Sequence, residues 1–153
     1  VIGGLFVACG YLMIFLYVVS KTNKIPEKKG SDYKRHTFWG GFRYAFIGVL
    51  TAIQEETNLL VQFAASMLVV VFGVALRISA VEWCICFIMC FLVMSLELVN
   101  TSFENLCDRV TMENDTAIKK IKDISAGAVL MMSICAVIIA GIIFLPKVPF
   151  LFK

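Results

Sequence analysis

Four polar side chains recur along an otherwise apolar stretch in the second half of the chain. Glu97, Asn100, Glu104 and Asp108 are three or four positions apart, so they stack on one face if the stretch is helical. A carboxylate at bilayer depth costs about 3 kcal/mol even on permissive scales, and such a group usually faces a protein interior or a water-filled cavity. We call these four residues the acidic row, and their pattern predicts a functional site rather than a lipid-facing surface.

Polar residues at two other boundaries of apolar segments are expected to reach the same membrane face. Glu56 and Asn58 stand where one apolar segment begins, and Lys122 and Asp123 stand where another begins. Gathering so many carboxylates is costly unless a cation neutralises them, and Mg²⁺ takes oxygen ligands and bridges carboxylates to phosphates. Because the nucleotide would come from the cytoplasm and a lipid headgroup from the interface, these residues indicate phosphoryl transfer to a lipid hydroxyl.

Two other interpretations of the acidic row stay open from the residues alone. Glu97 and Glu104 could form buried polar contacts that only specify how helices pair. The row could also serve as an ion or proton relay in a small helical membrane transporter. A kinase would transfer phosphate to added lipid, a transporter would move a solute across sealed vesicles, and a structural subunit would do neither.

Long apolar segments supply the helices that must position these residues. About 20 apolar residues span a bilayer as a helix. The chain of 153 residues is 60% hydrophobic, with a mean hydropathy of +0.89. Segments near the required length cover residues 1–20, 58–76, 83–107 and 124–145. Residues 38–53 alternate apolar and polar sides at helical spacing, which is typical of a helix lying in the membrane interface.

The predicted fold is therefore all-α. It is an integral membrane helical bundle with an amphipathic surface helix, three transmembrane helices and an extra N-terminal transmembrane helix. We assign residues 1–20 to the additional segment, 21–37 to a basic linker, 38–147 to the catalytic domain and 148–153 to a C-terminal tail. A signal peptide is the alternative for residues 1–20, but a basic start and a clear cleavage site are missing.

The basic residues predict the orientation of the chain. Of 14 lysines and arginines, all but Arg77, Lys147 and Lys153 lie between the first and second segments or between the third and fourth. The positive-inside rule therefore places both of these connections in the cytoplasm, and the acidic row opens towards the same side. The net charge of +3 is too small to suggest a nucleic-acid partner.

The acidic row resembles the signature of the bacterial diacylglycerol kinase and undecaprenol kinase family of integral membrane lipid kinases. That signature reads roughly Glu-x-x-Asn-[Thr/Ser]-Ala-x-Glu-x-x-x-Asp, and it is matched here by Glu97, Asn100, Thr101, Glu104 and Asp108. Ser102 replaces the usual Ala. Two further family motifs are matched by the Lys-Asp pair before the last span and by residues around the second span: Lys122, Asp123, Ala45, Gly48, Glu56 and Asn58.

The resemblance implies a multi-pass enzyme of the bacterial cytoplasmic membrane that uses ATP and Mg²⁺. It also implies a homotrimer whose active sites are shared between subunits at the cytoplasmic face. By position, Glu97 would be the general base on the lipid hydroxyl, and Glu56 and Glu104 would hold Mg²⁺. The nucleotide would lie among Tyr44, Glu56, Asn100, Glu104, Glu113, Asp115, Lys122 and Asp123, with Asn58 and Asp108 in support.

Some features depart from the family pattern. A basic residue and a His often follow the acidic residue of the second span, but Leu60 and Gln62 stand at those places. His36 is the single histidine and is expected to be a solvated linker residue. The last span and its Phe-Leu-Pro-Lys end look closest to the undecaprenol kinase branch. The expected acceptor is therefore undecaprenol, giving undecaprenyl phosphate, with diacylglycerol, giving phosphatidic acid, as the alternative.

Overall fold

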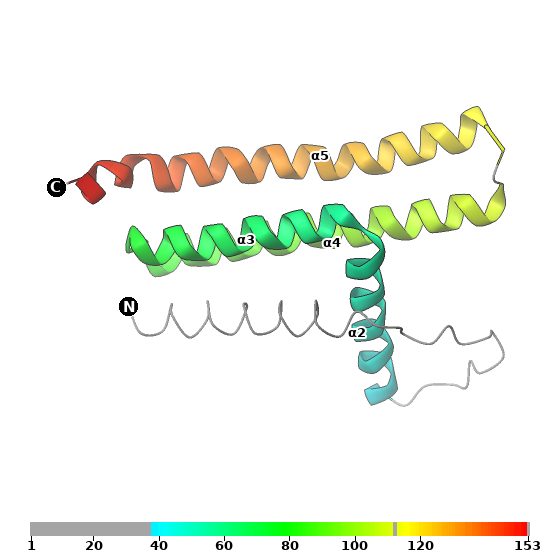
Figure 1. Cartoon of the computed structure of the whole chain (residues 1–153), viewed down its shortest axis with the longest axis horizontal. Coiled ribbons are helices and arrows are strands. Elements are labelled where there is room, and N and C mark those ends of the chain that lie inside the picture. Colours follow the sequence, from blue (N-terminus) through cyan, green and yellow to red (C-terminus); the bar gives the residue numbers. More distant parts are fainter. Residues whose placement is uncertain (1–37, 112, 153) are drawn as a thin grey trace.

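A computed structural model describes residues 38–111 and 113–152 of the chain. The helices in that part are α2 (Phe38–Glu55), α3 (Thr57–Ala75), α4 (Ala80–Val110) and α5 (Thr116–Phe144), followed by a 3-10 helix, η1 (Leu145–Phe152) (Figure 1). The described residues form helices joined by short connections, which confirms the all-α class. The predicted segment 1–20 and the linker 21–37, with His36, lie outside the described residues.

Three helices are long and apolar enough to cross a membrane, covering Thr57–Ala75, Ala80–Val110 and Thr116–Pro149. They confirm the three spans predicted for this part of the chain. α5 begins earlier than the predicted residue 124, because its first turns are too polar to count as an apolar span. Asp115 caps this start, since its side chain accepts hydrogen bonds from the backbone N–H groups of Ala117 and Ile118.

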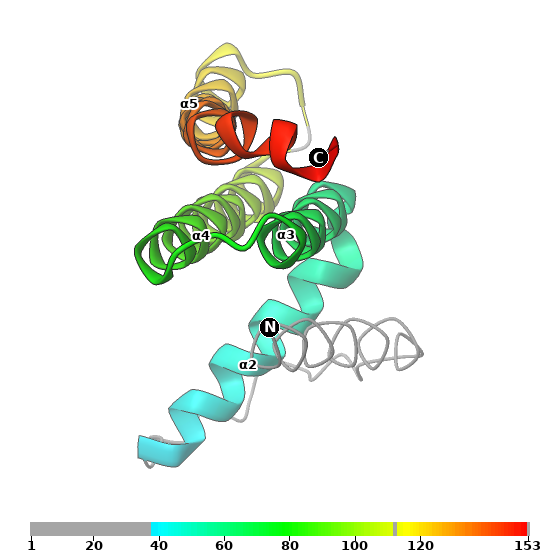
Figure 2. The same ribbon diagram turned by 90° about the vertical axis from the view of Figure 1, so that its left-hand side faces the viewer.

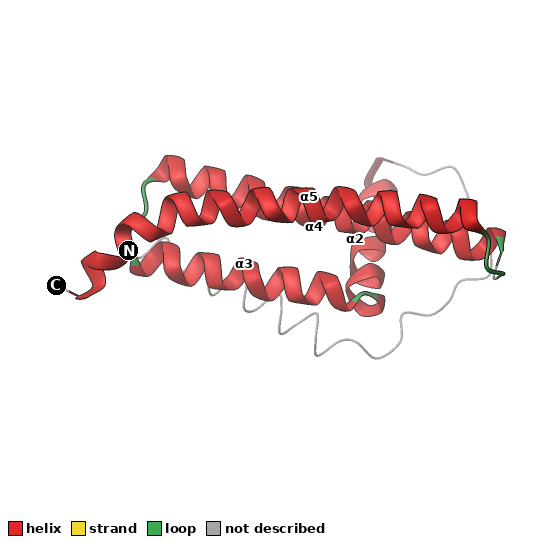
Figure 3. Cartoon of the chain, turned by 90° about the horizontal axis from the view of Figure 1, so that it is seen from above, coloured by secondary structure: helices red, strands yellow, loops and turns green. Residues whose placement is uncertain are grey.

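α4 is the helix that organises the bundle. It packs against α5, α3 and α2, whereas α3 and α5 contact each other less. Seen end-on, α3, α4 and α5 form a triangle (Figure 2). Seen from above, α5 lies over α4 and α3 lies to one side (Figure 3). A residue on α4 can therefore face a space that α3 and α5 both line.

α2 lies across the bundle instead of along it (Figure 1). It covers the predicted surface helix at 38–53 and continues to Glu55. Glu56 then takes an extended conformation, so the chain turns directly into α3. On α2, Phe42 and Phe46 are about 60% exposed while Ala52 is buried. This crosswise helix with exposed aromatic side chains fits a membrane interface, where its apolar side would enter the lipid.

The turn between α3 and α4 closes the opposite end of the bundle. Ile78 N–H donates to the carbonyl of Gly73 and Arg77 N–H to that of Val74, which is the Schellman pattern of helix termination. Arg77 takes the left-handed conformation, with φ of 51°. Ser79 and Glu82 form a capping box at the start of α4.

Two contacts pack this end of the bundle together. Lys147 of η1 forms an ion pair with Glu82. The indole of Trp83 lies over Gly73 and stacks on Phe87, with ring centroids 5.3 Å apart. A Cβ on Gly73 would come within 2.6 Å of the Trp83 ring, so α3 and α4 can approach here only because residue 73 is glycine.

We expect Gly73→Ala to destabilise the bundle by about 1–3 kcal/mol, because the stacked Trp83 ring must shift to admit the new methyl group. The midpoint of thermal unfolding in detergent would measure this effect. Gly127→Ala on α5 is the matched control, because no described side chain lies within 4 Å of its new Cβ. Equal midpoints for Gly73→Ala and the wild type would contradict the packing argument.

Candidate active site

The acidic row lies on one face of α4, as its spacing predicts, and its exposure increases along the helix. Glu97 is 3% exposed and Asn100 is 6% exposed. Glu104 is half-buried, and the side chain of Asp108 is 50% exposed. The row therefore begins inside the bundle and ends in solvent near the connection from α4 to α5.

Three members of the acidic row line a pocket of about 320 Å³ between α3, α4 and α5. We call it the acidic pocket. α4 contributes Glu97, Asn100 and Glu104, and α3 contributes Asn58 and Gln62. The remaining wall comes from Val61 on α3 and from small and apolar residues of α5: Ala126, Val129, Leu130 and Ser133. The pocket thus joins carboxylates and amides to a mainly apolar wall.

Each pocket carboxylate of α4 accepts a hydrogen bond from an amide. Gln62 Nε2 donates to Glu97 Oε2 over 2.8 Å, and Asn100 Nδ2 donates to Glu104 Oε1 over 2.8 Å. The amide oxygens Gln62 Oε1 and Asn100 Oδ1 are buried without a hydrogen-bond partner, as is Thr101 Oγ1. Unpaired buried acceptors are uncommon, and Gln62 and Asn100 both line the acidic pocket, so additional donors are expected there.

Gln62 has no assigned role in the sequence analysis, where it appears only as a departure from the family pattern. The sequence did indicate that Gln62 shares a face of α3 with Asn58, because the two residues are four positions apart. The partner could not be read from the sequence. Only the packing of α3 on α4 shows that Gln62 contacts Glu97.

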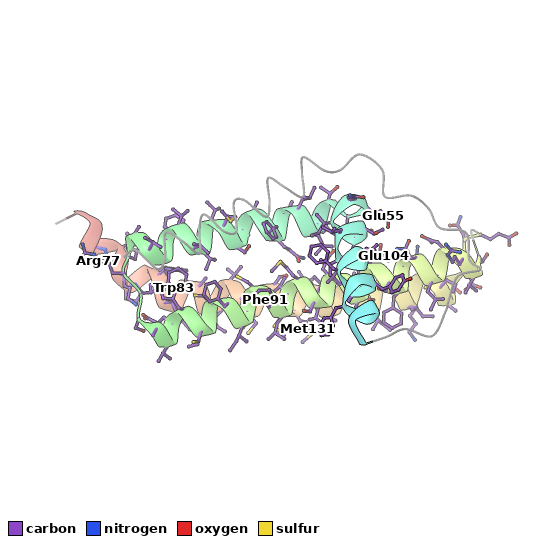
Figure 4. All side chains as sticks on the ribbon, turned by 90° about the horizontal axis from the view of Figure 1, so that it is seen from below. Glu55, Arg77, Trp83, Phe91, Glu104 and Met131 are labelled. Atoms are coloured by element: carbon purple, nitrogen blue, oxygen red, sulfur yellow. The ribbon has the colours of Figure 1, made fainter. Side chains whose placement is uncertain are left out.

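Glu56 lies at the N-cap of α3, outside the spanning helix. Desolvation raises the pKa of its carboxyl above the ordinary value, and the negative charges of Glu104, Glu97 and Glu55 raise it further. Figure 4 shows Glu55 and Glu104 where α2 meets α3, at the opposite end of the bundle from Arg77 and Trp83. Glu56 thus shares an electrostatic environment with the acidic pocket, as its predicted role requires.

Lys122 of α5 pairs with Asp108 of α4, with Nζ and Oδ1 2.5 Å apart. In the described part of the chain, the other ion pair joins Lys147 to Glu82 at the far end of the bundle. Glu97 and Glu104 therefore have no cationic partner among the described residues. Lys122 is the basic side chain that the fold brings nearest to the exposed end of the acidic row.

Six of the eight predicted nucleotide residues do not line the acidic pocket: Tyr44, Glu56, Glu113, Asp115, Lys122 and Asp123. Glu113 and Asp115 lie in the connection from α4 to α5, where Asp115 caps α5. Tyr44 is exposed on α2 and Asp123 is exposed on α5. Glu113, Asp115, Tyr44 and Asp123 are accessible from solvent and lie outside the pocket that Glu97 and Glu104 line.

A second pocket, of about 280 Å³, continues from the acidic pocket along the bundle. We call it the apolar pocket. The two share Val61, Gln62 and Ser133, and the apolar pocket extends to Val69 on α3 and Cys90 on α4. Its lining is almost entirely apolar, with Val93, Ala136, Val137 and Ala140 among its residues. The two adjoining pockets fit a molecule that has a polar end and a hydrocarbon chain.

The residues available for a metal ion are few. Among residues 38–111 and 113–152, no three Asp, Glu, His or Cys side chains come close enough together to hold a metal. Glu56 and Glu104 offer only carboxylate oxygens, which suit Mg²⁺ better than a softer metal. A Mg²⁺ ion here would need further oxygen ligands, and the phosphates of a nucleotide could supply them.

Comparison with known proteins now assigns the family. A profile described as prokaryotic diacylglycerol kinase matches residues 43–144. The chain is 34% identical to undecaprenol kinase of Bacillus subtilis (strain 168) over 79% of its own length and 98% of that protein. It is 35% identical to diacylglycerol kinase of Synechocystis sp. over 80% of its own length and 71% of that protein. No solved structure matches.

The profile covers most of the chain, including α3, α4 and α5, and the carboxylates of the acidic pocket lie within it. The three apolar helices agree with a family of membrane proteins. The earlier resemblance is thereby confirmed, and the acidic pocket lies in the part that this chain shares with its relatives. The chain belongs to the prokaryotic diacylglycerol kinase family and is an integral membrane lipid kinase, a phosphotransferase that acts on an alcohol group.

Proposed function

We propose that the protein transfers the γ-phosphoryl group of ATP to a lipid hydroxyl in the acidic pocket, with Glu97 as the general base. The observation that carries this proposal is the buried carboxylate of Glu97, which has an amide partner and no cationic partner in the described chain. A general base needs a carboxylate oxygen that a substrate hydroxyl can reach and that no cation occupies.

The shape of the site supports a lipid acceptor. Glu97 lines the acidic pocket, and Gln62 and Val61 connect that pocket to the apolar pocket. A lipid lying with its hydrocarbon chain along the apolar pocket would present its hydroxyl at the acidic pocket. Positioning and charge neutralisation are most of what phosphoryl transfer requires of a protein, so a base and a bound nucleotide at this place would suffice.

We also propose that Glu56 and Glu104 bind the Mg²⁺ that accompanies ATP. The pKa of Glu56 is raised first by desolvation and then by the charges of Glu104 and Glu97, and this second contribution supports a site where a cation would be stabilised. When bound, the ion would neutralise carboxylates and phosphates and polarise the γ-phosphate. The carboxylates of this chain would fix the position of the phosphates beside Glu97, and Asn100 would hold Glu104 in place through its hydrogen bond.

Lys122 is the proposed cationic contact for the phosphates. Its ion pair with Asp108 is partly exposed, with side-chain exposures of 33% and 50%, so it is weak enough to rearrange when a nucleotide binds. Glu113, Asp115, Tyr44 and Asp123 remain predicted nucleotide contacts. Each is exposed near the same end of the bundle, where a nucleotide base or ribose would have to lie outside the pocket.

The proposed location is the bacterial cytoplasmic membrane, with the active site open to the cytoplasm. Arg109, Lys119, Lys120 and Lys122 lie in or beside the connection from α4 to α5, at the open end of the acidic row. This charge distribution supports the orientation through the positive-inside rule. We further propose a homotrimer with shared sites, in which exposed polar residues near this end, such as Asn58 and Asn105, would contact a neighbouring subunit.

The proposed lipid acceptor is undecaprenol, with diacylglycerol as the alternative. The Bacillus relative, named undecaprenol kinase, is matched over nearly its whole length, and the Synechocystis relative, named diacylglycerol kinase, over less of its length. The apolar pocket suits either hydrocarbon chain, so the choice depends on this comparison and on the likeness of the last span.

We expect Glu97→Gln to lower kcat by at least about 100-fold, because the amide cannot accept the hydroxyl proton. Transfer of labelled phosphate from ATP to lipid in detergent–lipid mixtures would measure the loss. Trimer assembly, measured by size-exclusion chromatography with light scattering, should be unchanged. Glu55→Gln is the matched control, because Glu55 is an exposed carboxylate outside the acidic pocket. Full activity of Glu97→Gln would rule out Glu97 as the base.

We expect Mg²⁺ and a non-hydrolysable ATP analogue together to raise the melting temperature more than the sum of their separate effects, because each supplies ligands that the other needs. Glu104→Gln should abolish this synergy. The synergy should also weaken as the pH falls towards the raised pKa of Glu56, because protons then compete with the ion. A synergy that survives in Glu104→Gln would contradict the assignment of this carboxylate.

Parallel assays with undecaprenol and diacylglycerol, each dispersed in the same detergent, would identify the acceptor. We expect the higher kcat/KM with undecaprenol. A higher value with diacylglycerol would reverse the substrate assignment and leave the kinase assignment intact. Phosphate transfer to neither lipid would contradict the proposed function itself.

A further inference from the structure

Gln62 makes the one hydrogen bond that the described chain gives to the Glu97 carboxylate. The bond joins α3 to α4 at the place where the acidic pocket meets the apolar pocket, because Gln62 lines both. This hydrogen bond is accepted by Oε2 of the Glu97 carboxylate only. The second carboxylate oxygen is left for another donor, and in the proposed function that donor is the lipid hydroxyl.

The chemistry of the partner matters as much as its position. A lysine or arginine in this place would stabilise the ionised carboxylate and make it a poor proton acceptor. Elsewhere in this fold, a lysine does pair with a carboxylate, at Lys122 and Asp108. A glutamine amide instead orients the carboxylate through an N–H donor and adds no net charge. Gln62 can thus restrict the rotation of Glu97 without placing a positive charge beside it.

The other half of the Gln62 amide is an unused hydrogen-bond acceptor. Oε1 is buried and has no hydrogen-bond partner while Nε2 donates to Glu97. Once Glu97 holds a proton, its O–H group becomes a donor. A half-turn about the last side-chain bond of Gln62 would direct Oε1 towards that donor, so the amide can serve both protonation states of the base.

We propose that Gln62 is a positioning residue, which holds the Glu97 carboxylate against the acceptor hydroxyl and accepts a hydrogen bond from it after proton transfer. This inference rests on the proposed function. In the step that it serves, the hydroxyl oxygen forms a bond to the γ-phosphorus, and the bond from that phosphorus to ADP breaks with its electron pair leaving on ADP. The hydroxyl proton passes to Glu97 and later to water.

Two substitutions of Gln62 test the role. Gln62→Met keeps the length of the side chain but removes the donor, and we expect kcat to fall by about 10- to 100-fold. The KM values for lipid and for ATP should stay near those of the wild type, because Gln62 acts through Glu97. Gln62→His retains an N–H donor and should restore part of the lost kcat.

Ser102→Ala is the control. Ser102 is exposed on α4 and lines neither the acidic nor the apolar pocket, and its hydroxyl donates to the carbonyl of Leu98 instead of to Glu97. We expect its kcat to equal that of the wild type. Thermal unfolding of every variant in the same detergent separates lost folding from lost positioning.

The outcomes distinguish this inference from the function on which it rests. If the wild type transfers phosphate to lipid and Gln62→Met keeps the wild-type kcat, the positioning role is wrong and the kinase mechanism stands. The role is also wrong if Gln62→Met raises a KM and leaves kcat unchanged, or if Ser102→Ala loses as much kcat. If the wild type transfers no phosphate to any lipid, the proposed function fails and this inference fails with it.

Discussion

The burial of Glu97 is the constraint on which the rest of the site depends. An ionised carboxylate removed from water must find hydrogen-bond donors or a cation, or else bind a proton. In the described chain it finds only the amide of Gln62. α3 must therefore pack on α4 closely enough to bring that amide within reach. The close approach at Gly73 and Trp83, several turns away, belongs to the same helix pair.

Charge is distributed along the bundle in a way that keeps this region free of cations. The two ion pairs of the described residues lie near its ends, with Glu82 and Lys147 at one and Asp108 and Lys122 at the other. Between them the lining consists of carboxylates, amides and apolar groups. In a low dielectric such a region attracts a bound cation strongly, and it also leaves room for hydrocarbon.

Sequence periodicity was most informative where it agrees with the chemistry of the residues. The spacing of Glu97, Asn100 and Glu104 predicted a shared helix face, and the structure confirms that all three line one pocket. Spacing was less informative for Glu113 and Asp115. Both lie in the connection between α4 and α5, where no regular helix geometry relates one residue to the next. Asp115 shows why, because a residue that caps a helix is as polar as one that binds a ligand.

The sequence by itself determined the helices, their apolar lengths, the acidic row and the family, since these follow from local pattern and from residue identity. Tertiary structure alone decided which residue of α3 contacts Glu97, that Lys122 pairs with Asp108, and that an apolar pocket continues from the acidic one. The physical reason is that helix periodicity fixes which residues share a face of one helix. The rotation and depth at which helices meet depend on packing along their whole contact, which no short motif encodes.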